Sequence, residues 1–291
     1  MREDLQTELA TLCRRHARSI GLTPTAVDGL FVACRTQKGE KRSFSEPYAA
    51  IVLQGRKCTY VNNTAFAYGA GNSVITCVDL PTETVIEEAS ADVPFLSVVV
   101  RLNRKLLSEL ALQQGGVAQS AGQAGIPLLV QACPDELADN ALRLLRLLDT
   151  PDQIALLGPV LMREFHARLL LGPQGAWLRE VCAFGSKLNQ ISKAIGLIKE
   201  GFASDIRTED LAREVNMSTA SFHRHFKAVT GCSPIRYQKI LRLYEARRCL
   251  TSGRSKVLDT AYSVGYASAS QFTKDHRDFF GVAPSRDSLE A

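Results

Sequence analysis

The sequence predicts an α+β protein of two domains, a strand-rich front half with flanking helices followed by an all-helical last third. Residues 25–100 hold short runs rich in Val, Ile, Thr and Tyr that alternate with turn signals. Residues 205–284 repeat one helical pattern, and Lys and Arg are concentrated in this region. From residue 186 onward they number 17 against 11 Asp and Glu, whereas the rest of the chain holds 18 against 19. An apolar content of 45% in 291 residues is enough to bury two cores.

The front half is expected to begin with an amphipathic helix over residues 4–20, with Leu5, Leu9 and Leu12 on one side, and to break at residues 21–24. Strands are expected at 30–34, 50–53, 57–61, 73–78, 84–86 and 95–100. Short strands at this rhythm are typical of a sandwich or a small barrel.

Leucine-rich helices follow near residues 106–110, from 134 and from 152, with a Gly/Gln/Ala-rich loop over 113–125. These helices either cover the barrel or meet their copies in a dimer, and the pattern favours neither. Turn residues at 172–175 then divide the chain into a domain over 1–172, a linker region over 173–186 and a domain over 187–291.

The last third contains an internal repeat. Ser218, Phe222, Lys227, Gly231 and Pro234 recur 50 residues later as Ser268, Phe272, Arg277, Gly281 and Pro284. Ala212 and Val215 recur at an offset of 49 as Ala261 and Val264. Positions kept in register over this length indicate a duplicated supersecondary unit.

Each copy has the pattern of a helix-turn-helix. Thr208 and two acids open the first helix, Ser218 caps the second, and Gly231 ends it. The second copy is expected to have helices at 257–264 and 268–280. Ser233 and Pro234 begin a connecting helix that runs to about residue 251 and spans roughly 25 Å. With the width of each motif added, the second helices of the two copies lie about 34 Å apart, one turn of B-DNA.

The second helix of each copy presents a polar outer face. The candidate DNA-binding residues are Ser218, Thr219, Ala220, His223, Arg224 and Lys227 in the first copy and Ser268, Ala269, Ser270, Gln271 and Lys274 in the second. Arg, Gln and hydroxyl side chains can bond base edges, while Lys and Ser mostly hold phosphates. One such face is as well explained by solvation, but two copies at this spacing favour DNA.

Residues 205–284 resemble the paired helix-turn-helix domain of the AraC/XylS family of bacterial transcription regulators. The resemblance rests on residues 211–212, 217–218, 222–227, 231–234, 242 and 246–247 in the first half, and on 261, 264–266, 271–272, 280–281 and 283–284 in the second. It implies base contacts by Ala220, His223 and Arg224, and by Ala269, Ser270, Gln271 and Lys274. One position departs from the pattern, because His276 stands where Phe or Tyr is usual. A polar ring there either weakens the packing of the second reading helix or bonds a backbone carbonyl.

Residues 24–30, 53–57, 68–71 and 78–81 are similar to the cupin-type N-terminal domain of one AraC subgroup. This resemblance implies a cupin-like β-barrel that binds an effector and dimerises. Metal-dependent cupin enzymes use two or three His plus a carboxylate, and residues 25–150 contain no His. Sequence motifs of hydrolases, zinc proteases and P-loop proteins are also absent. We therefore expect binding without catalysis, with no metal and no cofactor.

Strand residues supply the candidates for effector binding. Phe31, Val52, Tyr60 and Val99 could face a pocket inside the barrel, although alternation along a strand does not say which side is inside. Cys34, Cys58 and Cys77 also lie on predicted strands of the barrel. These thiols are either inert and buried or, with a lowered pKa, sensors of an electrophile or oxidant.

The sequence thus predicts a regulator that binds double-stranded operator DNA and a small-molecule effector of unknown identity. We expect a homodimer, with RNA polymerase as a further candidate partner. Eight scattered cysteines without zinc spacing and the lack of a long apolar run predict a cytoplasmic protein without a membrane partner. The rival interpretations are an enzyme that still acts in the barrel and an architectural DNA-binding protein without an effector.

Overall fold

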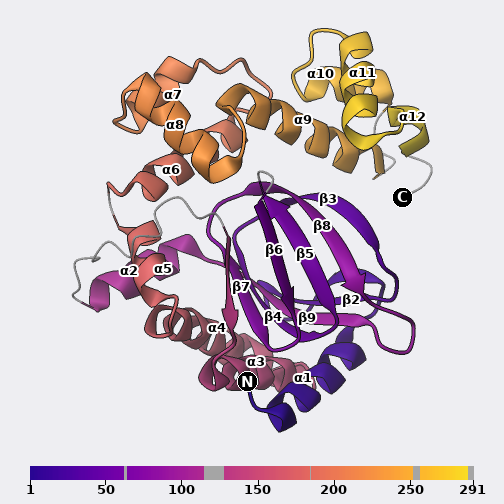
Figure 1. Cartoon of the computed structure of the whole chain (residues 1–291), viewed down its shortest axis with the longest axis vertical. Helices are drawn as coiled ribbons and strands as arrows, with labels where there is room; N and C mark the ends of the chain where they lie inside the picture. Colours follow the sequence, from indigo (N-terminus) through magenta and orange to yellow (C-terminus); the bar gives the residue numbers. More distant parts are fainter. Residues whose placement is uncertain (62–63, 115–127, 184, 252–255, 288–291) are drawn as a thin grey trace. The chain divides into compact units, whose positions relative to one another are not determined.

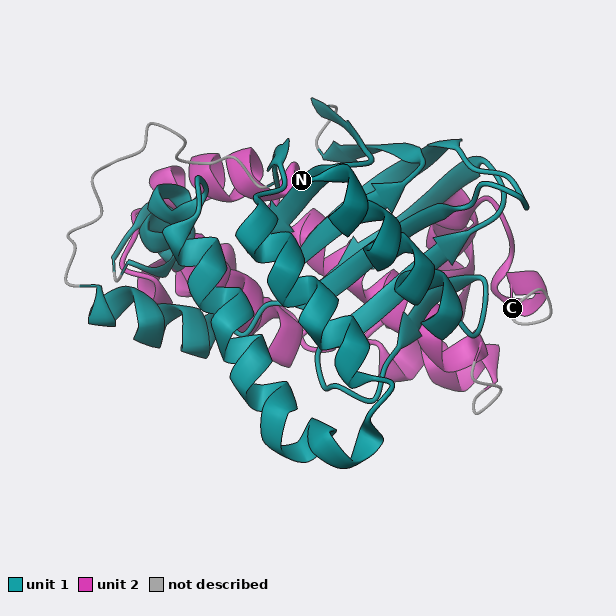
Figure 2. Cartoon of the chain, turned by 90° about the horizontal axis from the view of Figure 1, so that it is seen from below, with its two compact units in different colours: residues 1–189 teal, residues 190–291 magenta. Residues whose placement is uncertain are grey.

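A computed structural model describes residues 1–61, 64–114, 128–183, 185–251 and 256–287. The chain divides into two compact units, residues 1–189 and 190–291 (Figure 2). Among the described residues, no helix has both the length and the apolar character that crossing a membrane requires.

The first unit contains two antiparallel sheets (Figure 1). The larger has the order β1 (Gly21–Pro24), β2 (Leu30–Arg35), β9 (Phe95–Arg101), β4 (Tyr48–Gln54), β7 (Asn72–Thr76) and β10 (Leu128–Ala132). The smaller has the order β3 (Gly39–Ser45), β8 (Leu80–Glu88), β5 (Arg56–Val61) and β6 (Thr64–Gly69). No strand ladder among the described residues closes the two sheets into a ring, so the predicted barrel is a two-sheet arrangement of the cupin-like type. The predicted fold class, a β-rich unit with flanking helices before a helical unit, is confirmed.

A cluster of buried side chains joins the two sheets. Val52, Val74, Phe95 and Leu128 of the larger sheet form one cluster with Tyr68 of the smaller sheet. The Tyr68 hydroxyl lies 2.7 Å from the Thr59 hydroxyl, which satisfies this buried phenol inside the cluster.

The helices of the first unit pack on the larger sheet through the first of them, which contacts β2, β4 and β9, and otherwise on one another. They are α1 (Glu3–His16), α2 (Arg104–Gln113), α3 (Asp135–Leu147), the 3-10 turn η1 (Pro151–Gln153), α4 (Ile154–Leu171) and α5 (Gly175–Cys182). Helix α1 buries Leu5, Leu9 and Leu12, as the sequence predicts. It ends at His16, earlier than the predicted residue 20, and residues 21–24, which interrupt the helical pattern, pair with β2 as strand β1. Residues 115–125 of the predicted loop lie outside the described residues.

The predicted linker region, 173–186, contains helix α5. Gln174, directly before this helix, is buried and donates a hydrogen bond from Nε2 to the Ser73 hydroxyl at 3.0 Å. Trp177 and Leu178 are buried as well, so α5 packs into the first unit.

The second unit consists of helices. They are α6 (Lys187–Glu200), which begins in the first unit, α7 (Thr208–Glu214), α8 (Thr219–Thr230), α9 (Pro234–Thr251), α10 (Val257–Ser263), α11 (Ala269–Phe280) and α12 (Pro284–Asp287). The predicted cap Ser218 and the predicted ends at Gly231 and Gly281 are confirmed: the Ser218 hydroxyl accepts from the backbone N–H three residues later, and both glycines end their helices at φ 80°. Ser268, predicted as the first residue of its helix, is instead its cap and accepts from the N–H of Gln271. Thr208 is not the predicted cap, because it is the buried first residue of α7.

Helix α9 contributes to both helix-turn-helix motifs (Figure 1). Its first half places Tyr237 edge-on against Phe226 of α8, with ring centroids 5.5 Å apart. Its second half places Leu243, Ala246 and Leu250 in the cluster that contains Phe272 of α11. The two motifs therefore share one rigid element.

The turn between α7 and α8 and the turn between α10 and α11 have the same backbone hydrogen bond. The N–H of Met217 donates to the Ala212 carbonyl at 2.9 Å, and the N–H of Tyr266 donates to the Ala261 carbonyl at 3.0 Å. Both turns place a residue in the left-handed region, Asn216 at φ 55° and Gly265 at φ 90°. A Cβ on Gly265 would lie 2.1 Å from the Ala203 carbonyl oxygen, so only glycine fits this turn.

We expect Gly265→Ala to lower the free energy of unfolding by about 3 kcal/mol or more, because it combines backbone strain with a backbone clash. Gly281→Ala is the matched control, since Gly281 has a similar φ but no atom within 4 Å of the added Cβ. The control is expected to lose only about 1–2 kcal/mol. Urea titrations followed by circular dichroism compare the two, and equal midpoints would contradict the expected clash.

Candidate functional site

Helix α8 presents the predicted polar face to solvent. Phe222 and Phe226 are buried, which turns His223, Arg224 and Lys227 outward. Ser218 and Ala220 are exposed and Thr219 is half-buried. Within the described residues, neither Arg224 nor Lys227 forms an ion pair, so both charges are available to an external anion.

Helix α11 presents the second predicted face. Ser268, Ser270, Gln271 and Lys274 are exposed, and the half-buried Ala269 packs against the Phe272 cluster. Gln271 Nε2 donates to Asp275 Oδ1 at 3.0 Å, which orients its amide and leaves the amide oxygen free to accept. Lys239 of α9 binds the same carboxylate oxygen at 2.7 Å.

His276, the departure from the family pattern, is completely buried. Its Nδ1 lies 3.1 Å from the Val282 carbonyl, so this nitrogen carries the proton and donates. The ring also packs at 5.6 Å from Phe272 and 4.7 Å from Phe280. Burial lowers the pKa of His276, although the Val282 carbonyl acts in the opposite direction. Of the two sequence alternatives, the structure therefore has the carbonyl bond.

Arg242 of α9 is a positioning residue whose role the sequence analysis did not identify. Its guanidinium donates to three carbonyls of the segment before α7, those of Phe202 at 2.7 Å, Ser204 at 3.0 Å and Ala203 at 3.2 Å. It also donates to the carbonyl of Gly265, in the turn before α11, at 2.8 Å. One side chain thus joins the segment before the first motif to the turn of the second.

Helix α6 holds the first turn in a similar way. Gln190 Nε2 donates to the Val215 carbonyl at 2.7 Å, and the Lys193 ammonium donates to the Glu214 carbonyl at 3.0 Å. These bonds satisfy carbonyls at the end of α7 that have no partner inside that helix. Both turns that orient the recognition helices, α8 and α11, are therefore held from outside.

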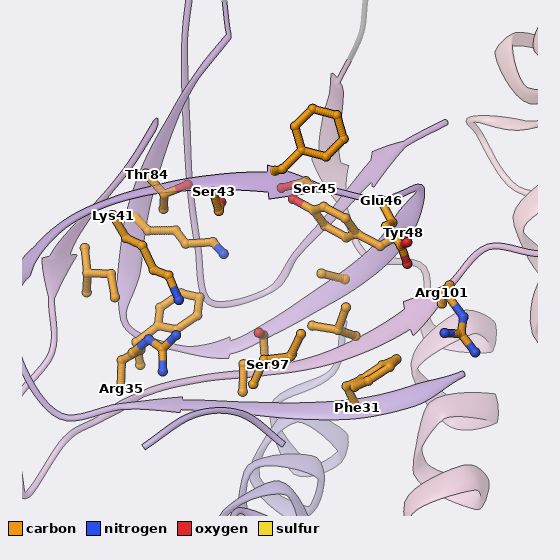
Figure 3. Close-up of a pocket in the computed structure, with 18 of the residues that line it drawn as sticks. Phe31, Arg35, Lys41, Ser43, Ser45, Glu46, Tyr48, Thr84, Ser97 and Arg101 are labelled. Atoms are coloured by element: carbon orange, nitrogen blue, oxygen red, sulfur yellow. The ribbon is translucent and has the colours of Figure 1, made fainter. Parts of the chain in front are cut away.

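The first unit contains a cavity of about 340 Å³ between its two sheets (Figure 3). Alternate residues of β2, β9 and β4 face it, and direct cross-strand partners lie on the same side: Phe31 opposite Val99, and Ala33 opposite Ser97. The opposite wall comes from β3, β5 and β8, with Ser43, Thr84 and Ile86.

Four cations line this cavity, namely Arg35, Lys41, Lys57 and Arg101, against one acid, Glu46. Figure 3 shows Arg35 and Lys41 at one end and Glu46 and Arg101 at the other. Lys57 Nζ lies 5.0 Å from the Phe95 ring centroid and 5.3 Å from that of Tyr68. Burial, with the nearby Arg35, lowers the pKa of Lys57 to about 8.

Of the predicted effector-binding residues, Phe31 and Val99 line this cavity. Cys34 and Cys58 alternate with the lining residues Arg35 and Lys57 and face the other way. Val52 is buried in the cluster that joins the sheets, Tyr60 is 40% exposed, and Cys77 is buried beyond the end of β7. None of these five lies in the cavity wall.

Cys77, one of the three predicted sensor thiols, is buried. Burial raises the pKa of Cys77 well above its usual range, which disfavours the thiolate that a sensor needs. Across the described parts of the chain, no three His, Cys, Asp or Glu side chains are grouped so that they could hold a metal ion.

Comparison with known families matches both halves of the chain. Residues 26–177 match the family model of the AraC-type transcriptional regulator N-terminus. Residues 211–287 match a helix-turn-helix domain model.

Individual relatives cover less of the sequence. GbdR of Pseudomonas aeruginosa is 30% identical over 100 residues, 34% of this chain and 27% of that protein. The virulence regulon activator VirF of Yersinia enterocolitica is 26% identical over 164 residues, 56% of this chain and 60% of VirF. The chain thus matches about a quarter of the length of GbdR and three fifths of that of VirF.

The fold is shared with ToxT of Vibrio cholerae. A crystal structure of apo ToxT superposes with a TM-score of 0.64 over 91% of this chain and 99% of ToxT, at 15% identity. A second ToxT structure, with a TM-score of 0.59, contains an unsaturated fatty acid. At this identity the likeness concerns the fold.

We expect Arg242→Lys to lower the free energy of unfolding by roughly 1–3 kcal/mol, because an ammonium cannot reach all four carbonyls and the part-buried Gly265 carbonyl loses its bond to a charged donor. Arg248→Lys, on the exposed side of the same helix, is the control and is expected to stay within about 0.5 kcal/mol of the parent. Urea titration measures both. A midpoint for Arg242→Lys equal to that of the control would show that the four bonds contribute nothing.

Proposed function

The chain belongs to the AraC family of transcriptional regulators, and on that premise we propose that it binds specific DNA and responds to a small-molecule effector. The observation that carries the proposal is the duplicated helix-turn-helix built on the shared helix α9. Each copy presents an exposed polar face on a capped recognition helix.

The recognition helices α8 and α11 enter two successive major grooves on one side of the duplex. Helix α9 has 18 residues and is therefore about 27 Å long, which suits groove centres about 34 Å apart once the width of the motifs is added. Arg224, Gln271 and Lys274 read base edges, while Lys227 and the capping hydroxyls of Ser218 and Ser268 hold phosphates. Thr219, Ala220, His223, Ala269 and Ser270 complete the contact surface.

The cavity of the first unit binds the effector without changing it. Phe31 and Val99 contribute apolar surface, and charged side chains fix the orientation of the ligand. The fatty acid bound to ToxT supports a small-molecule role for this fold. The effector regulates DNA binding if the protein has two arrangements that differ in DNA affinity and the effector binds one of them more tightly than the other. We propose no enzymatic activity.

The protein acts as a homodimer in the cytoplasm, where its operator lies, and RNA polymerase is a further partner. Helix α4 supplies the dimer surface, because Leu156 is 78% exposed and Val160, four residues later on the same side, is 61% exposed. A second copy of the same face would bury both.

Arg224→Ala is expected to weaken binding to the selected operator by roughly 1–3 kcal/mol and to relax its sequence preference, because a base contact is lost. Lys227→Ala is expected to weaken operator and random DNA alike and to lower the slope of log affinity against log salt by about one. Operators are first selected from random DNA with the parent protein, and gel shifts at several salt concentrations then compare the variants. Identical behaviour of the two variants on both DNAs would contradict the assigned roles.

Val160→Glu is expected to shift the dimer toward monomer, because a charge would be buried against the same face of the partner. Leu112→Glu is the control, since Leu112 is 82% exposed on a different helix, α2. Sedimentation velocity over a range of concentrations measures both. A monomeric parent, or equal dissociation of the two variants, would exclude the α4 face as the dimer surface.

A further inference from the structure

The cavity of the first unit has an unbalanced charge at one end. At the Arg101 end, Arg101 Nη2 bonds Asp28 Oδ1 at 2.9 Å, and Glu46 adds a second carboxylate to the wall. At the other end stand Arg35, Lys41 and Lys57, and within the described residues neither Arg35 nor Lys57 has an acidic partner. The surplus positive charge therefore lies at the Arg35–Lys57 end.

The chain holds these two cations in place although they repel each other. The Arg35 guanidinium fills the space beside Gly21, where an added Cβ would lie 2.7 Å from Nη1. The Lys57 ammonium rests between the rings of Phe95 and Tyr68. Aromatic faces compensate only part of the lost hydration of an ammonium, and the lowered pKa of Lys57 reflects the remainder. A bound anion would relieve both the repulsion and the desolvation.

The rest of the wall between the two ends is mainly apolar. Phe31 and Val99, which are cross-strand partners, line the floor of the cavity, and Ala50 lies beside Val99 on the next strand. Ile86 contributes from the opposite wall. A volume of about 340 Å³ lies at the small end of the range for ligand sites, roughly 300–1,000 Å³.

We infer that this cavity takes an organic carboxylate, with its carboxylate group bound by Arg35 and Lys57 and its apolar body lying along Phe31 and Val99. A guanidinium can donate two parallel hydrogen bonds to a carboxylate, and an ammonium beside it adds a third donor. Neutral sugars or alcohols of the same size would leave both cations unpaired. The inference rests on the proposed function only in treating the cavity as the effector site.

Calorimetric titration of the full chain tests the charge requirement directly. The probes are decanoate below its micellar concentration, 1-decanol and acetate, which separate the acidic group from the apolar body. We expect decanoate to bind at least ten times more tightly than either of the others. Equal affinity for decanoate and 1-decanol would overturn the inference without the use of any variant.

Variants then locate the carboxylate. Lys57→Met and Arg35→Met keep an apolar side chain of similar length, and each is expected to lower decanoate affinity at least tenfold while leaving 1-decanol binding unchanged. Arg42→Met is the matched control, because Arg42 carries the same charge on β3 but pairs with Glu83 and lies outside the cavity wall. Decanoate affinity that is retained in both cavity variants would overturn the assignment.

Gel shifts with the selected operator, with and without decanoate, separate the inference from the proposed function. Selective decanoate binding that leaves operator affinity unchanged would support the carboxylate site and contradict its role as the effector site. A chain that binds decanoate selectively but binds no operator would contradict the proposed function alone.

Discussion

Helix α9 belongs to two hydrophobic cores at once, and the DNA-binding unit depends on this sharing. Tyr237 packs on Phe226 in the first motif, while Leu243, Ala246 and Leu250 pack around Phe272 in the second. A close-packed interior resists deformation, so neither recognition helix can turn about α9 without disturbing a core. Arg242 adds hydrogen bonds to this packing. Three of its carbonyl partners lie before the first motif, and the fourth lies in the turn of the second.

The second motif keeps its packing although one of its core positions is polar. Phe226 in α8 corresponds by the repeat to His276 in α11, and both are completely buried. The imidazole remains compatible with an apolar core because the Val282 carbonyl accepts its Nδ1–H and two phenylalanine rings flank it. The Nδ1–H therefore does not carry the full desolvation penalty of a buried polar group, and the second ring nitrogen, Nε2, lies 3.4 Å from Asp287 Oδ2.

Both units present cations, but the surroundings of these cations differ between the two units. The recognition helices expose Arg and Lys side chains to water, and these cations stay hydrated until DNA binds. Arg35 and Lys57 instead stand in a cavity between two sheets, where these charges are partly desolvated and where neither pairs with a carboxylate of the described residues. Buried cations without a counter-charge are unfavourable, so a small anion that pairs with them is favoured in the cavity.

The sequence by itself determined the duplicated motif, its caps and its exposed faces, because helix periodicity, capping serines and terminal glycines act over a few neighbouring residues. Local pattern also predicted most strands and put Cys34 and Arg35 on opposite faces of β2, but it could not say which of the two faces the cavity, since alternation does not say which side is inside. Only the tertiary structure decided that β1 pairs with β2, that Arg242 joins the two motifs, and that cations distant in sequence meet between the sheets. These features depend on which segments come close in space. The sequence around Arg35 and Lys57 shows a charged residue in a strand, but it does not show that the two residues meet.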